Sequence, residues 1–165
     1  MEKENTTLLF QKLQSKYCEL LDAYKNILDI VNKEKEFIKD EKFDKLNEIL
    51  NSKAEEIKKI EIINMNKDKI EKEICSIFNA RKMIFDDYKD HISNALFDNI
   101  KEVRGQLETL ISKIAEIQNE NHDILAKDFE VLKNDIGKLK TDKKVLNSYA
   151  DTFGQYESRF IDKSY

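Results

Sequence analysis

The chain has 165 residues with no proline, three glycines and no tryptophan, and 38% of its residues are charged. Proline breaks helices and sheets most strongly, and the alternating apolar pattern of strands is missing, so the composition predicts an all-α protein with one sizeable core. The 29 basic and 33 acidic residues give a net charge of −4 and are intermixed, which argues against a nucleic-acid-binding face.

The sequence predicts a cytoplasmic location. No run approaches the roughly 20 apolar residues that span a bilayer, so membrane insertion is not expected. Residues 1–5 lack the apolar core of a signal peptide. The two cysteines, Cys18 and Cys75, fit a compartment in which thiols stay reduced, and we expect no disulfide between them.

Two antiparallel helices joined by a tight polar corner are predicted next. The first begins at Asn5 or Thr6 and ends near Phe37, and the second begins near Asp40. Asp40 is expected to cap the second helix by accepting a backbone hydrogen bond, which lets the chain turn without glycine. Their apolar stripes, spaced by three and four residues, are Tyr17, Leu20, Leu21, Tyr24, Ile27, Leu28 and Val31, then Phe43, Leu46, Ile49, Leu50, Ala54, Ile57 and Ile60.

The second helix is expected to shift the phase of its stripe at residues 63–66 and to continue to about Ala80. Residues 81–95 are predicted to be either a short helix or a hydrophobic connection. The polar residues Asp86 and Asp87 mark the place where the chain changes direction.

A third long helix is predicted over residues 96–139, and its stripe slips by one residue at Asn121. Thr141 is expected to begin a short fourth helical segment that Gly154 ends. The predicted architecture is therefore an elongated antiparallel bundle or coiled coil of three long helices over residues 1–140. An aromatic-rich segment follows at residues 141–165, and the sequence leaves open whether it is ordered.

Catalytic and metal-binding patterns are missing from the sequence. The two histidines, His91 and His122, have no cysteine or second histidine at metal-ligand spacing. Glycine-rich phosphate loops are absent as well. We therefore expect that the protein is not an enzyme and that it binds no metal and no cofactor. Some apolar stripes extend beyond the neighbouring helices that could cover them, and this predicts a surface for binding other proteins.

Three stretches of the chain resemble the flagellar export chaperones of the FlgN type, which are related in shape to the FliT type. They are LLDAYKNIL at 20–28 leading into EKEFI at 34–38, FDKLNEIL at 43–50 followed by Lys53, Glu55 and Glu56, and IQNENHDIL at 117–125. The corner at residues 40–42 departs from the family's frequent glycine-containing turn.

The resemblance implies a small cytoplasmic chaperone that binds the C-terminal helical segment of a hook-associated protein, either a hook-filament junction or a cap protein. It would prevent premature assembly and deliver this cargo to the export gate. The expected cargo-binding residues are Asn121, Leu125, Phe129, Leu132, Ile136 and Leu139. The residues expected to fold over an empty groove or to contact the gate are Tyr149, Phe153, Tyr156 and Phe160.

Two other functions stay open at this point. The same stripes suit a homodimeric coiled coil with a structural or adaptor role. A regulator that sequesters a transcription factor, as relatives of the FliT type do, would need no different surface.

Overall fold

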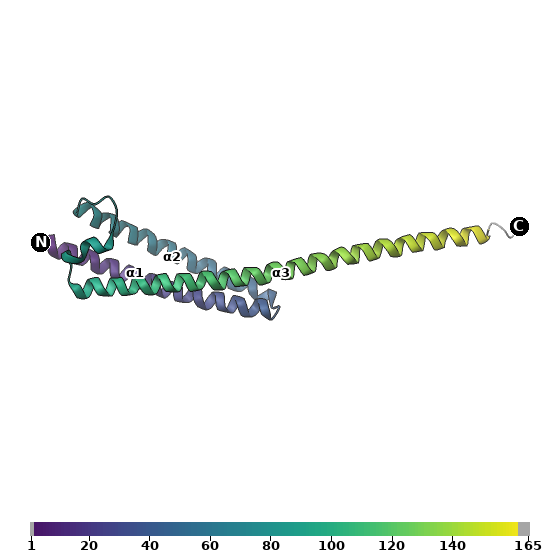
Figure 1. The fold of residues 1–165 in the computed structure, drawn as a ribbon, viewed down its shortest axis with the longest axis horizontal. Helices are drawn as coiled ribbons and strands as arrows, with labels where there is room; N and C mark the ends of the chain where they lie inside the picture. The colour runs from purple at the N-terminus through teal and green to yellow at the C-terminus, as the bar shows by residue number, and fades with distance from the viewer. Residues whose placement is uncertain (1, 162–165) are drawn as a thin grey trace. The chain divides into compact units, whose positions relative to one another are not determined.

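A computed structural model describes the backbone of residues 2–161 and the side chains of residues 5–42 and 44–145. These described residues contain helices and turns but no strand, so the all-α prediction is confirmed. The elements are α1 (Glu2–Lys39), α2 (Phe43–Ile77), the short 3-10 helix η1 (Phe85–His91) and α3 (Asn94–Ile161) (Figure 1). The chain divides into two compact units, a first unit of residues 1–121 and a second unit of residues 122–165.

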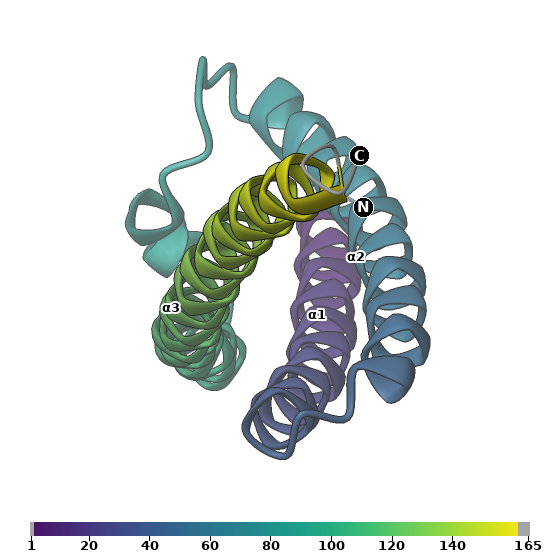
Figure 2. The same ribbon diagram turned by 90° about the vertical axis from the view of Figure 1, so that its right-hand side faces the viewer.

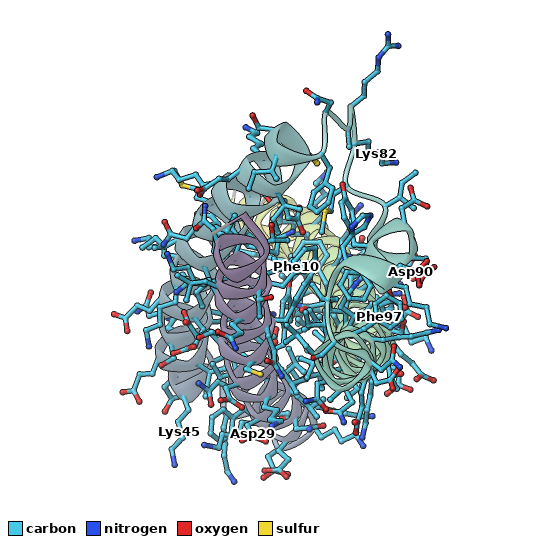
Figure 3. The ribbon with its side chains drawn as sticks, turned by 90° about the vertical axis from the view of Figure 1, so that its left-hand side faces the viewer. Phe10, Asp29, Lys45, Lys82, Asp90 and Phe97 are labelled. Carbon is cyan, nitrogen blue, oxygen red and sulfur yellow. The ribbon has the colours of Figure 1, made fainter. Side chains whose placement is uncertain are left out.

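In the first unit, α1 and α2 form an antiparallel hairpin, and α1 lies between α2 and the first part of α3 (Figures 2 and 3). Phe10 and Phe97 point into the interior, whereas Asp29 and Lys45 point outward (Figure 3). The core has two clusters along α1. The first holds Leu9, Phe10, Leu13, Ile74, Phe85, Tyr88, Leu96, Phe97 and Ile100, and the second holds Leu20, Leu21, Ala23, Ile27, Val31, Ile60, Leu107, Ile114 and Ile117.

Tyr17 joins all three helices of the first unit. Its hydroxyl donates a hydrogen bond to Oε1 of Glu71 on α2 at 3.0 Å. Lys67 of α2 and Arg104 of α3 place their cationic groups over the ring, 5.9 and 5.8 Å from its centroid. Burial of the phenol raises the pKa of Tyr17, and the nearby carboxylate of Glu71 raises it further. The tyrosine is therefore a neutral donor at any physiological pH.

The corner between α1 and α2 turns through the backbone rather than through a side-chain cap. The amides of Glu41 and Lys42 donate to the carbonyls of Ile38 and Phe37, at 3.2 and 2.9 Å. This Schellman pattern satisfies the last carbonyls of α1 and places Glu41 in the left-handed region, at φ 55°. The expected Asp40 cap is wrong, because Lys42 occupies the cap position without a side-chain hydrogen bond.

A second Schellman motif ends α2. The amides of Asn79 and Ala80 donate to the carbonyls of Ser76 and Cys75, at 3.3 and 2.8 Å, and Asn79 has φ 53°. α2 therefore runs through residues 63–66, as predicted, and stops at Ile77, short of Ala80. The following connection contains η1, whose two buried aromatic residues belong to the first core cluster.

The short fourth helical segment expected at Thr141 is wrong, because α3 is one helix from Asn94 to Ile161. The hydroxyl of Thr141 donates to the carbonyl of Gly137 at 3.0 Å, four residues back in the same helix, and caps nothing. α3 also passes through Gly154. The boundary between the two compact units falls after residue 121 of the chain. The domain division expected from the sequence at residue 140 stays a prediction.

One nearly buried ion pair fastens α2 to α1. Nζ of Lys53 lies 2.8 Å from Oε2 of Glu34, and the two side chains are 12% and 7% exposed. A carboxylate held away from water needs such a partner, because an uncompensated buried charge is costly. The pair therefore favours the register in which Lys53 of α2 lies beside Glu34 of α1.

We expect Glu41→Gly to raise the free energy of unfolding by about 0.5–1 kcal/mol, since glycine adopts the left-handed conformation without steric cost. Chemical denaturation measures this change. Glu36→Gly is the matched control inside α1, and it should lower the stability by about 1 kcal/mol. A loss of stability in both variants would show that the corner does not hold Glu41 in this conformation.

Lys53→Met should lower the free energy of unfolding by about 3 kcal/mol, because Glu34 is left buried without its partner. The double variant Glu34→Leu/Lys53→Met should recover most of that loss. Lys25→Met removes an exposed pair, with Asp22 at 3.1 Å, and should change the stability by less than about 0.5 kcal/mol. Equal effects of Lys53→Met and Lys25→Met in urea denaturation would contradict the assignment.

Candidate partner-binding surface

The second unit carries an apolar stripe that no described residue of that unit covers. Four of the six residues expected to bind cargo are strongly exposed on α3: Phe129 at 70%, Leu132 at 57%, Ile136 at 46% and Leu139 at 68%. Leu125, four residues before Phe129, is partly buried. Alternating spacings of four and three residues place all five side chains on one face of the helix. We call these five residues the α3 stripe.

Asn121 is separated from the α3 stripe by its burial. Its side chain is only 1% exposed, and Nδ2 donates to the carbonyl of Val31 on α1 at 3.0 Å. Oδ1 is buried without a hydrogen-bond partner. Beside it, Lys35 of α1 pairs with Glu120 of α3 and holds the pKa of that carboxyl below its usual range. Asn121 thus belongs to the seam between α1 and α3 in the first unit.

The spacing within α3 explains this placement. Ile114, Ile117 and Asn121 follow one another at intervals of three and four, so Asn121 continues the buried stripe of the first unit. A lone polar side chain in such a stripe costs stability and fixes the register of packed helices. The aromatic residues expected to act as a switch or gate contact, Tyr149, Phe153, Tyr156 and Phe160, lie outside the residues whose side chains are described.

The described residues of the first unit line several hollows. A cleft of about 510 Å³ between α1 and α3 is lined by Leu21, Leu28 and Leu110, with Lys25 and Lys113 among its other residues. Gly105 also lines it, and a Cβ built there meets nothing within 4 Å. Periodicity alone did not reveal this cleft, because its leucines read as ordinary core positions.

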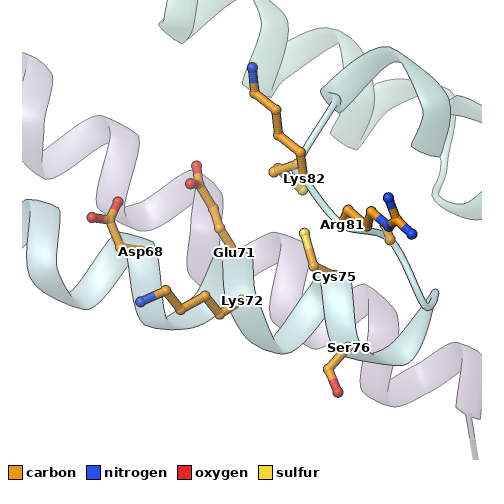
Figure 4. A pocket seen from close by; sticks show the side chains of 9 residues that line it. Asp68, Glu71, Lys72, Cys75, Ser76, Arg81 and Lys82 are labelled. Carbon is orange, nitrogen blue, oxygen red and sulfur yellow. The ribbon is translucent and has the colours of Figure 1, made fainter.

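Another hollow, of about 440 Å³, lies at the end of α2 (Figure 4). Glu71, Cys75 and Arg81 are among its lining residues, and Lys72 points away from Cys75 (Figure 4). Burial raises the pKa of Tyr88, and the nearby thiol of Cys75 raises it further. These groups do not converge on one point, and among the described residues no cluster of His, Cys, Asp or Glu could hold a metal ion.

Asn121→Leu should leave the free energy of unfolding unchanged or raise it by about 1 kcal/mol, because it removes the unpaired Oδ1 while the Val31 carbonyl stays inside α1. Asn121→Asp sets a carboxylate against that carbonyl and should lower the free energy of unfolding by about 2–4 kcal/mol. Urea denaturation compares the two. A large loss of stability in Asn121→Leu would show that the polar contact is a net stabiliser of the seam.

None of the helices in the described residues is long and apolar enough to cross a membrane. No curated protein and no solved structure matches the chain significantly. A family model described as FlgN protein matches residues 1–157, which includes all of the first unit and most of the second. FlgN is a chaperone family, and the resemblance seen in three stretches of the sequence is confirmed. The chain therefore belongs to the FlgN family.

Proposed function

We propose that the protein is a cytoplasmic flagellar export chaperone. It binds the C-terminal helical segment of a hook-associated protein, keeps that segment from assembling prematurely and delivers it to the export gate. The observation that carries this proposal is the exposed α3 stripe in a member of a chaperone family. The hook-filament junction and cap proteins are the proposed cargo.

The α3 stripe has the chemistry that an amphipathic cargo helix requires. Such a helix buries its apolar face in a partner through residues at i, i+3, i+4 and i+7, and Phe129, Leu132 and Ile136 take the i, i+3 and i+7 positions of that spacing. Each large apolar side chain contributes roughly 1.5–3 kcal/mol when it is moved from water into a fully apolar contact. The four exposed members of the stripe can therefore offset a substantial part of the entropic cost of association.

The aromatic residues Tyr149, Phe153, Tyr156 and Phe160 are proposed to regulate this surface, either by covering the stripe when cargo is absent or by contacting the export gate. A FliT-like regulator that sequesters a transcription factor would use the same stripe. Among the described residues no feature favours the regulator over the export chaperone, so the export chaperone remains the proposed function.

Leu132→Asp tests the role of the stripe. It places a charge at the centre of the stripe and should weaken binding of a synthetic peptide spanning the C-terminal helix of a hook-associated protein by at least about tenfold. Circular dichroism should show nearly unchanged helical content, because Leu132 is 57% exposed. Isothermal titration calorimetry with the full chain measures the affinity.

Asn134→Asp is the matched control, since it adds the same charge at an exposed position on the other side of α3. It should bind the peptide as the unaltered chain does. Unchanged binding by Leu132→Asp, or equal weakening by both variants, would exclude the stripe as the cargo site. Unfolding of Leu132→Asp would instead assign Leu132 to the core and also count against the proposal.

A further inference from the structure

The cleft between α1 and α3 has an apolar floor at the edge of the second core cluster. Leu21 is buried in that cluster, and Leu28 and Leu110 pack against it while part of each side chain stays exposed. Gly105 leaves room beside them, since a Cβ built there meets nothing within 4 Å. From Gly105 to Lys113 the cleft follows α3 for about 12 Å. An apolar chain can therefore lie along it.

Two lysines stand on opposite walls of this cleft at nearly the same level. α1 and the first part of α3 run in the same direction (Figure 1), and Asn121 bonds the carbonyl of Val31, 90 positions earlier. A residue of α3 thus lies level with the α1 residue about 90 positions before it, so Lys113 lies within one helical turn of Lys25 along the helix axes. Their flexible side chains can approach one anion from both sides.

The charge of the cleft has one sign. Among the described residues that line it, Lys25 and Lys113 are the charged ones, and none is a carboxylate. No described residue forms an ion pair with Lys113. Lys25 pairs with Asp22 at 3.1 Å, but that pair is exposed to water and contributes little. The two neutral polar side chains of the lining already donate to groups of α3 itself, so the lysines are left to bind an incoming anion.

We infer that this cleft binds the free anion of a medium-chain fatty acid, with its carboxylate between Lys25 and Lys113 and its hydrocarbon chain over the leucines. The cleft volume of about 510 Å³ lies within the range of roughly 300–1,000 Å³ that small-molecule sites occupy. A stable protein interface takes about 20–30 residues on each side, whereas eight residues line this cleft. The size of the cleft therefore favours a small amphiphile over a partner helix.

Titration of the full chain with sodium dodecanoate, kept below its micellar concentration, tests the site. Isothermal titration calorimetry should give a dissociation constant on the order of 100 μM or lower. Dodecyltrimethylammonium has the same hydrocarbon chain with a cationic head, and its dissociation constant should be at least about tenfold higher. Equal affinity for the two amphiphiles, or no binding of dodecanoate at about 1 mM, would overturn the inference.

Charge reversal tests the two lysines. Lys25→Glu/Lys113→Glu should raise the dissociation constant for dodecanoate at least about tenfold, because like charges now meet in the cleft. The same variant should bind dodecyltrimethylammonium more tightly than the unaltered chain does, a gain that misfolding would not produce. Lys12→Glu/Lys101→Glu makes the same change in net charge at exposed positions outside the cleft and should bind dodecanoate normally. Equal weakening by both double variants would contradict the assigned contacts.

Filling the cleft tests its location. Gly105→Leu should abolish dodecanoate binding without loss of helical content, since leucine favours a helix more than glycine does. Gly137→Leu is the matched control, because a Cβ at this other glycine of α3 also meets nothing within 4 Å, and it should bind dodecanoate normally. Binding that survives Gly105→Leu but not Leu132→Asp would place the fatty acid on the α3 stripe and overturn the inference.

Two other occupants are outcomes of the same tests. Phosphatidylglycerol vesicles that bind the unaltered chain but not Gly105→Leu would assign the cleft to a membrane surface. A hook-associated peptide that displaces dodecanoate would assign it to a protein partner, and either result would overturn the inference. The inference does not rest on the proposed function, since Gly105→Leu should lose dodecanoate and keep its affinity for the peptide, whereas Leu132→Asp should do the reverse.

Discussion

Burial of α1 on both sides is the constraint on which the first unit depends. Phe10, Leu13 and Val31 have no exposed surface, and both core clusters run along this helix. α2 contributes far fewer buried residues to the core than α1, and its Leu50 and Ile57 remain more than 40% exposed. Close packing explains this difference, because a helix packed on two sides buries more of its side chains than a helix packed on one side. α2 therefore covers one side of α1 in the hairpin, and the first part of α3 covers the other side at the seam.

Periodicity predicted the helices well and their ends poorly. The stripes of α1 and α2 recur at three and four residues, and that signal is strong because the whole buried face must obey it. The corner was mispredicted because a Schellman turn uses backbone amides, and Glu41 in a left-handed conformation leaves no mark in composition. Thr141 and Gly154 resemble a start and a stop, but α3 continues through both, since one residue costs only about 1 kcal/mol in a long helix.

Part of the candidate surface was predictable from the sequence and part was not. The stripe formed by Phe129, Leu132, Ile136 and Leu139 was predictable, because its apolar side chains recur at spacings of three and four along α3. Asn121 was grouped with them by its place in the sequence, yet its carboxamide reaches an α1 carbonyl ninety positions away. Whether a polar residue in a stripe faces water or a buried backbone group depends on tertiary neighbours, which a single sequence does not contain.

The separation of Val31 and Asn121 along the chain also sets an order of assembly during synthesis. α1 and α2 are joined by a three-residue corner, so their contacts close a short loop and can form as soon as α2 has left the ribosome. The second side of α1 must then wait until the first part of α3 has been made. During that interval Leu20, Ile27 and Val31 stay open to water on this side of α1, and the nascent hairpin is at its most vulnerable to proteases and to aggregation with neighbouring chains.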